Sequence, residues 1–283
     1  AVGSGRQYSP SVVPLTVMRS KCRISRPRWT SFKIATIGQH LLWQLALNNL
    51  QALGAPQAEM DSWRDRDIQA ELARATGLPV YVQNDATSAC GAELVFGTGE
   101  RPKDFLYFYF GTFIGGGLVL NGQLFLGRTG NAAGVGPLPV QGPDGQMRRL
   151  FDSASMSVLE AMMTAAGESP DHLWESPNHW QVSEPVLQAW VDLAAEGLAG
   201  AILSAATLLE LEAVLIDGWM PPKVRAMVTL RTQEALARLD LSGVSMPQVR
   251  EGTVGAQARS LGAAAIPLSQ RYLIDQNAAA RGA

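Results

Sequence analysis

The chain has 283 residues, 47% of them hydrophobic and 17% charged, and a formal net charge of −2. This composition excludes a disordered protein, and the length allows one large domain or two ordinary lobes. Cys22 and Cys90 are the only cysteines, which excludes a disulfide framework and a structural zinc set. No apolar run approaches ~18 residues and no secretory signal pattern opens the chain, so we expect a cytoplasmic protein with no membrane partner.

Basic residues are concentrated near the start of the chain. The first 58 residues contain seven Lys or Arg and no Asp or Glu, whereas the rest carries 16 basic and 25 acidic groups. Such an arm suits nucleic acid or an acidic surface, or is simply an atypical N-terminus. Proline breaks the basic run at residues 23–29, which argues against a recognition helix. We assign residues 1–52 to an atypical basic N-terminal segment.

Helices and strands alternate in the next part of the sequence. The pattern predicts helices at residues 39–53 and 65–75, the second ended by Gly77, then a strand at 79–83 and a helix at 85–96. Antiparallel strands are predicted at 105–110, 115–120 and 123–126, with Asn121-Gly122 as the turn of the last hairpin. The order indicates an α/β protein.

The second half of the sequence is mainly helical. The pattern predicts helices at 153–166, 184–209, 221–239 and 256–272, the last interrupted near Pro267. Strands are predicted at 212–216 and 248–251, and a loop at 167–181. The loop contains His172, His179, Trp174 and Trp180. Two histidines without a nearby cysteine or tight acidic pattern are weak metal ligands, so we expect a lid or oligomer-contact loop whose aromatic residues are packing anchors.

Two motifs carry most of the functional information. Asn84-Asp85-Ala86 is followed by the segment from Gly111 to Gly117, a glycine-dense turn between two apolar strands. A lone Asp can deprotonate an attacking hydroxyl, and backbone N–H groups of a glycine turn can hold phosphate oxygens. Asp85 could instead cap the helix that it begins, and the glycines could serve only a tight turn.

These motifs resemble the ROK family of bacterial sugar kinases and sugar-responsive repressors. The similarity covers residues 53–272, and the segments 215–222 and 255–268 look more like repressors than glucokinases. The resemblance implies the actin-like, ribonuclease-H-like ATPase fold with two lobes around a cleft. We expect an N-terminal lobe at 53–126, lacking part of its structure, and a helix-rich C-terminal lobe at 127–283.

The resemblance also implies roles for individual residues. Asp85 would be the general base toward a sugar hydroxyl, and Asn84 would hold a neighbouring hydroxyl. Glu160 matches the last sugar-binding Glu of the family, although it could equally lie on a solvated helix face. The second phosphate turn would consist of Gly111, Thr112, Gly115, Gly116 and Gly117, holding ATP with Mg²⁺ if kinase activity is retained.

Several family features are missing from this sequence. The first phosphate turn needs an acid that helps to hold Mg²⁺, and residues 1–58 contain none. Gly134 and Pro137 occupy the positions of the Glu and His that bind the sugar and zinc. Residues 146–152 replace the cysteine-rich zinc loop, so we expect no bound metal and no zinc.

These departures leave three functions open. The first is a ROK-type transcriptional regulator that binds a sugar or sugar phosphate through a degenerate kinase site, forms a homodimer, and reaches DNA only through a winged helix not visible in this chain. The second is an ATP-dependent sugar kinase with Asp85 as base. The third is a non-catalytic fragment or assembly partner.

Overall fold

The structure is a computed structural model that describes the backbone of residues 66–272 and the side chains of residues 66–267. The chain divides into two units, Ala1–Val82 and Gln83–Ala283, and each is considered by itself. The helix predicted at 39–53 and the basic segment 1–52 lie outside the described residues.

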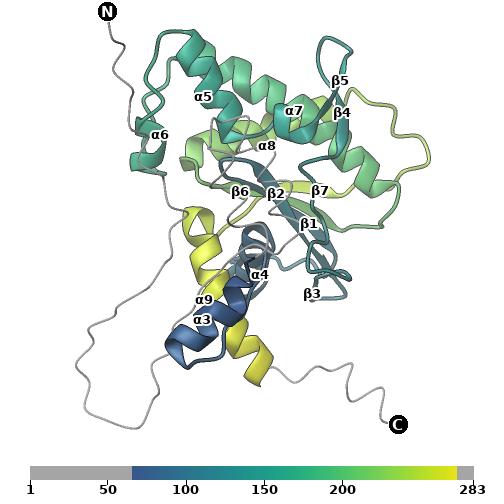
Figure 1. Cartoon of the computed structure of the whole chain (residues 1–283). Helices are drawn as coiled ribbons and strands as arrows, with labels where there is room; N and C mark the ends of the chain where they lie inside the picture. Colours follow the sequence, from purple (N-terminus) through teal and green to yellow (C-terminus); the bar gives the residue numbers. More distant parts are fainter. Residues whose placement is uncertain (1–65, 273–283) are drawn as a thin grey trace, which may run out of the picture. The chain divides into compact units, whose positions relative to one another are not determined.

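Residues 66–82 are the described part of the first unit, and they contain the helix α3, Ile68–Thr76 (Figure 1). Asp67 caps this helix by accepting a hydrogen bond from Ala70 N at 2.9 Å, and Gly77 ends it with a φ of 66°. The predicted helix and its glycine stop are confirmed. The strand predicted at 79–83 is wrong, because these residues pair with no described strand.

The second unit is built on a five-stranded sheet. Its strands are β1 (Phe105–Phe110), β2 (Ile114–Leu120), β3 (Gln123–Phe125), β6 (Ala213–Gly218) and β7 (Gln248–Glu251). The order is β3-β2-β1-β6-β7, with β1, β2 and β3 antiparallel in succession and β6 and β7 parallel to β1. Asn121 and Gly122, with φ of 54° and 72°, form the predicted hairpin turn.

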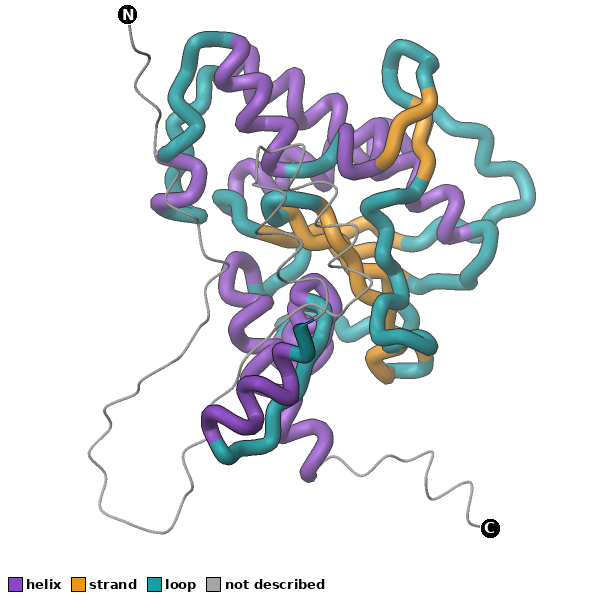
Figure 2. The backbone as a smooth tube through the Cα atoms, in the orientation of Figure 1, coloured by secondary structure: helices purple, strands orange, loops and turns teal. Residues whose placement is uncertain are grey.

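Helices cover both faces of this sheet (Figure 2). On one face, Leu106, Phe108 and Phe110 of β1 enter a core shared with α5, α7 and α8. On the other face, Phe105 and the two tyrosines of β1 enter a smaller core with α4 and α9. Because β1 is buried on both faces, it is apolar or aromatic at every position rather than alternating.

The helices that form these layers are α4 (Asp85–Phe96), α5 (Met156–Ala165), α6 (His172–Glu175), α7 (Glu184–Ala206), α8 (Pro222–Leu236) and α9 (Ala258–Tyr272). The predicted helices at 85–96, 153–166, 184–209 and 221–239 are thus present, the last three shorter than expected. The predicted interruption of the last helix is wrong: α9 continues through Pro267. Proline has no backbone N–H, so α9 lacks one of its internal hydrogen bonds at this position. Packing of α9 against α4 helps to keep the helix continuous.

Among the described helices, α7 alone is long and apolar enough to cross a membrane by length and composition. Half of that stretch is buried inside the protein, and Trp190, Leu198 and Ile202 of α7 are fully covered in the main core. Burial of this kind is typical of a core helix.

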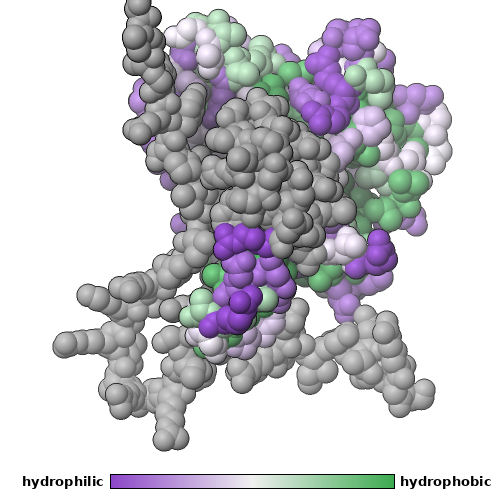
Figure 3. Space-filling view, viewed as in Figure 1, coloured by the Kyte–Doolittle hydropathy of each residue, from purple (hydrophilic) through white to green (hydrophobic). Residues whose placement is uncertain are grey.

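A small hairpin next to the main core is absent from the sequence-based prediction. It consists of β4 (Pro139–Gln141) and β5 (Met147–Arg149), and a 3₁₀ turn, Leu150–Asp152, follows it. Each strand is three residues long, too short for a clear period-two signal. Its tip is hydrophilic (Figure 3).

The lobe boundary expected at residue 126 stays a prediction, and the sheet has strands on both sides of that residue. Strands β1 to β3 precede that boundary and β6 and β7 follow it, yet all five belong to one sheet. The division of the chain between Val82 and Gln83 separates the unit containing α3 from the unit containing the sheet.

Candidate functional site

Asn84 and Asp85 stand at the first turn of α4, with different roles. Asn84 is buried, and its Oδ1 accepts a hydrogen bond from Thr87 N at 3.0 Å, so Asn84 is the helix cap. Asp85 is the first helical residue, and its exposed carboxylate accepts from Ala86 N at 2.9 Å. The expectation that Asp85 caps α4 is therefore wrong by one position. Asp85 remains accessible to a ligand.

The second oxygen of Asp85 faces a cation from α9. Arg259 Nη1 lies 3.3 Å from Asp85 Oδ2, and the two side chains are 34% and 57% exposed, respectively. The guanidinium also lies over the ring of Tyr109, 5.2 Å from its centroid. Stacking on an aromatic face fixes the plane of the guanidinium and adds a cation–π attraction.

The ring of Tyr109 packs against the Arg259 side of this ion pair. Its hydroxyl donates a hydrogen bond to the carbonyl of Ala256 at 3.2 Å. Burial raises the pKa of Tyr109 to about 12, against the opposing effect of the Arg259 charge. Tyr109 is therefore neutral at physiological pH and serves as a support for Arg259 rather than as an acid or base.

The turn at Gly111 and Thr112 joins β1 to β2 beside Arg259. A Cβ at Gly111 would lie 3.9 Å from Arg259 Nη1, so this backbone and the guanidinium are neighbours. The carbonyls of Gly111 and Thr112 each accept a hydrogen bond, at 3.1 Å, from the N–H groups of Met156 and Ser157. The turn is thus tied to the first turn of α5, while the Thr112 side chain is exposed.

Gly115, Gly116 and Gly117 lie within β2 and not in the turn. A Cβ at Gly115 would be 2.6 Å from Ala86 Cβ, and one at Gly117 would be 2.3 Å from Cys90 Cβ. A Cβ at Gly116 would be 2.7 Å from the carbonyl of Ala133. Close approach of α4 to one face and of a loop to the other therefore explains these glycines. Phosphate binding by all three stays a prediction.

Glu160 lies on α5, half-buried, and accepts a hydrogen bond from the indole N–H of Trp174. Burial raises the pKa of Glu160, while the bond from Trp174 lowers it. The solvated-face alternative for Glu160 is therefore wrong. No hydrogen bond or ion pair among the described residues joins Glu160 to Asp85, and sugar binding by Glu160 stays a prediction.

The aromatic residues of the 167–181 loop act as packing anchors, as expected. Trp174 stacks on Trp219 with centroids 6.3 Å apart, and Trp180 meets the buried Trp190 edge to face. His172 contacts Glu175 at 3.2 Å, and both side chains are exposed.

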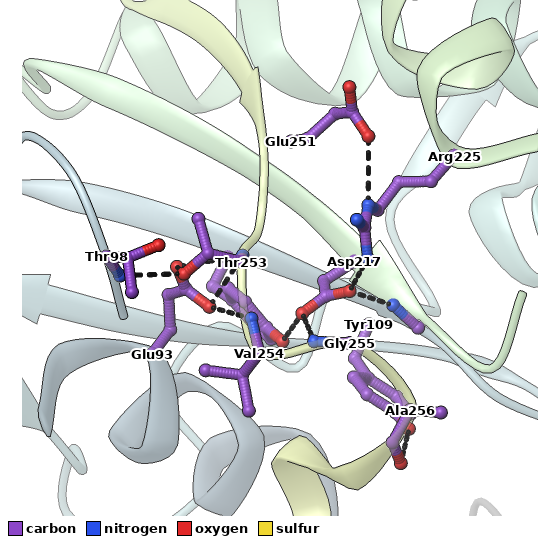
Figure 4. Close-up of polar contacts among 12 residues, drawn as sticks. Glu93, Thr98, Tyr109, Asp217, Arg225, Glu251, Thr253, Val254, Gly255 and Ala256 are labelled. Carbon is purple, nitrogen blue, oxygen red and sulfur yellow. Dashed lines mark hydrogen bonds and ion pairs between the residues drawn. The ribbon is translucent and has the colours of Figure 1, made fainter. Parts of the chain in front are cut away.

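Two buried carboxylates, which the sequence-based prediction missed, hold the chain that leads into α9 (Figure 4). Asp217 at the end of β6 is fully buried and accepts from Tyr107 Oη at 2.9 Å, Gly255 N at 2.8 Å and Arg225 Nη1 at 3.1 Å. Arg225 also bonds Glu251 at 3.0 Å. Burial raises the pKa of Tyr107 well above its ordinary value, so its hydroxyl remains a donor to Asp217.

Glu93 fixes the same connection from the α4 side. Its carboxylate accepts from Thr253 N at 3.0 Å, from Thr253 Oγ1 at 2.7 Å and from Val254 N at 3.1 Å. Residues 253–255 are therefore bound to both α4 and β6. These contacts determine where α9 begins and hence where Arg259 lies.

The groups around Asp85, which are the Arg259 guanidinium and the Gly111 turn, suit a phosphate oxygen better than a metal ion. The carboxylate beside the Gly111 turn, that of Asp85, is already paired with a cation. Within residues 66–267 no group of three His, Cys, Asp or Glu side chains could hold a metal.

Comparison with known proteins identifies the class. The ROK family model matches residues 48–270, so this chain belongs to the ROK family. It has the actin-like ATPase fold of that family, and the fold expectation is confirmed.

Curated relatives include a glucokinase of Halalkalibacterium halodurans, 38% identical over 31% of this chain and 30% of the relative. Another is the bifunctional enzyme NanE/NanK of Brucella melitensis, 30% identical over 71% of this chain and 37% of the relative. The chain thus spans about a third of the length of these relatives.

Solved structures of both kinases and regulators share the fold. A ROK glucokinase from Streptomyces griseus, in complex with glucose and AMPPNP, superposes with a TM-score of 0.58 at 24% identity, covering 71% of this chain and 72% of that one. A ROK transcriptional regulator, a homolog of the E. coli MLC protein, gives 0.52 at 22% identity, covering 71% and 55%.

Proposed function

We propose that this chain is the effector domain of a ROK-type transcriptional regulator, which binds a sugar or sugar derivative without phosphorylating it. The observation that carries the proposal is the ion pair between Asp85 and Arg259. A general base must be within reach of the hydroxyl whose proton it takes, and one oxygen of Asp85 instead accepts a hydrogen bond from the guanidinium of Arg259. The same carboxylate can still accept a hydrogen bond from a sugar hydroxyl.

Further residues support the loss of chemistry. Gly134 and Pro137 stand at positions where the family resemblance places a Glu and a His, and neither side chain can coordinate zinc or accept a sugar hydroxyl. One oxygen of Glu160 accepts a hydrogen bond from Trp174, which leaves the other oxygen as an acceptor for a sugar hydroxyl. Binding through Asn84, Asp85 and Glu160 needs none of the missing groups.

An ATP-dependent sugar kinase is the second candidate, because the curated relatives of this chain include a glucokinase and the bifunctional enzyme NanE/NanK. In that case Asp85 would act as base and ATP with Mg²⁺ would bind over Gly111 to Gly117. The third candidate, a non-catalytic assembly partner, would bind neither sugar nor nucleotide. A homodimer and a DNA-binding winged helix outside this chain remain part of the proposal.

A coupled ADP-release assay over a panel of sugars, run alongside ligand-dependent thermal shift, tests the proposal. We expect a sugar-dependent rise in melting temperature and no turnover. Saturable turnover that disappears in Asp85→Asn would establish the kinase instead. No shift with any sugar or nucleotide would favour the assembly partner.

A further inference from the structure

We propose that the groove between α7 and α8 is the surface through which two copies of this chain associate. This inference rests on the homodimer of the proposed function, since it assigns the face that forms it. The two helices pack side by side (Figure 1), and the groove between them has a volume of about 370 Å³. Pro143 of the β4–β5 hairpin also lines it, and it shares no residue with the candidate site.

Opposite charges lie on the two sides of this groove. The α7 side contributes Asp192 and Glu196, and α7 contains no lysine or arginine. The α8 side contributes Arg231 and Arg238, with one acid, Glu234, between them. Asp192 pairs with Arg231 at 3.5 Å, and Glu196 pairs with Arg238 one step further along both helices. An acidic row therefore runs beside a basic row, in register.

The ion pairs across the groove leave charge available for a partner. The four side chains that form them are between 35% and 61% exposed. Isolated exposed pairs contribute little to stability. A carboxylate can accept hydrogen bonds at both oxygens and a guanidinium has five N–H donors, so each group can bind a second partner.

A second copy supplies those partners. In a two-fold dimer the same surface meets itself. A two-fold axis that runs along the groove places α7 of one copy over α8 of the other and keeps the register. Asp192 then meets the partner's Arg231, and Glu196 meets the partner's Arg238, on both sides of the axis. The exposed pairs thereby join into one network, which contributes more than isolated pairs do.

Apolar side chains lie between the charged rows. Those of α7 are Ala189, Leu193 and Ala195. On α8, Leu230 precedes Arg231 and is 55% exposed. An apolar centre with a charged rim is the usual composition of a protein interface. A uniformly acidic or basic partner would be repelled by one of the two helices, whereas a second copy matches both.

Sedimentation equilibrium of the full chain and of charge-reversal variants tests this surface. Arg231→Glu with Arg238→Glu sets acids against acids, and should raise the dissociation constant of the dimer about 100-fold or more. Asp192→Arg with Glu196→Arg sets arginines against arginines and should have the same effect. An equimolar mixture of the two double variants should recover a dimer, because each acidic helix then faces a basic one.

A double variant with the same change in charge elsewhere is the control. Arg128→Glu with Arg250→Glu alters two residues outside the groove and should leave the dissociation constant unchanged. Circular dichroism and melting temperature show whether each double variant is folded. A variant that carries all four groove substitutions has opposite charges again within each copy and across the interface. It should dimerise like the wild type even if a double variant unfolds.

The outcomes separate this inference from the proposed function. Folded double variants that dimerise like the wild type would refute this surface and leave the homodimer intact. A mixture of the two that stays monomeric, or a fourfold variant that is folded and monomeric, would also refute it. Wild-type protein that is monomeric at every concentration would contradict both the surface and the homodimer, while sugar binding would stand on its own titration.

Discussion

The guanidinium of Arg259 and the carboxylate of Asp85 lie 3.3 Å apart, although 174 residues separate them in the chain. The pairing depends on the packing of α9 against α4, which in turn depends on the loop bound by Glu93 and Asp217. The candidate site is thus formed by α4 and α9, the first and the last helix of the second unit among the described residues.

Replacing Asp217 tests the network that positions α9. Asp217→Asn puts an amide against donors from Tyr107, Gly255 and Arg225, and removes the buried one of the two carboxylates that pair with Arg225, leaving only Glu251. We expect a loss of about 3–5 kcal/mol in the free energy of unfolding, as for other broken buried pairs, measured by urea denaturation.

The matched control is Asp144→Asn in the exposed pair with Arg148. Its denaturation midpoint should not move, because exposed ion pairs contribute little. Equal midpoints for the two variants would show that the Asp217 network does not stabilise the fold.

The substitution Gly117→Ala tests the packing of α4 on β2. The added Cβ would lie 2.3 Å from Cys90 Cβ, so the helix must move, at a cost of about 1–3 kcal/mol. In Gly200→Ala, on α7, the new Cβ meets Val140 at 3.8 Å, and removing a helical glycine should stabilise by up to ~1 kcal/mol. Opposite shifts in melting temperature are expected. A neutral Gly117→Ala would argue that the glycines of β2 serve a ligand and not packing.

Two substitutions of Asn84 distinguish its role as the cap of α4 from its proposed role in sugar binding. Asn84→Asp keeps the acceptor for Thr87 N but removes the amide donor, so stability should hold while sugar affinity falls. Asn84→Ala should also lose about 1 kcal/mol of stability with the cap. Calorimetric titration and thermal melting report the two effects. Unchanged affinity in Asn84→Asp would remove Asn84 from the binding site.

Glu160 should make stability depend on pH. Its folded-state pKa is raised, chiefly by burial, so the native state binds more protons than the unfolded state above the ordinary value of 4.5. This contribution to stability is present below that pH and is lost as pH rises through the folded-state pKa. Glu160→Gln, which still accepts from Trp174, should flatten the melting-temperature profile over that interval. Parallel profiles for the two proteins would contradict the assignment.

Local patterns predicted much of the fold. The Asn121-Gly122 turn, the glycine stop at Gly77 and the apolar runs of β1 and β6 depend on neighbouring residues and were predicted. The strands of the β4–β5 hairpin are three residues each, too short to show the alternation of apolar and polar residues that indicates a strand. The strand expected at 79–83 was wrong because an apolar run indicates burial without showing a pairing partner.

The candidate site was only partly predictable. Asp85 and the Gly111 turn came from the motif, but Arg259 emerged only from tertiary packing. One signal was available: an arginine in the first turn of a helix opposes the helix dipole and indicates a specific partner. Asp217, at the end of a buried apolar strand, was a comparable signal, since buried carboxylates are paired.

Titration of a panel of sugars and sugar 6-phosphates into protein with Mg²⁺-ATP, followed by ³¹P NMR of the same samples, tests the central claim most directly. Binding without phosphoryl transfer predicts saturable heat with at least one ligand, and a spectrum in which ATP persists and no new sugar phosphate or ADP accumulates. Stoichiometric conversion of ATP to ADP with a phosphorylated sugar would contradict it.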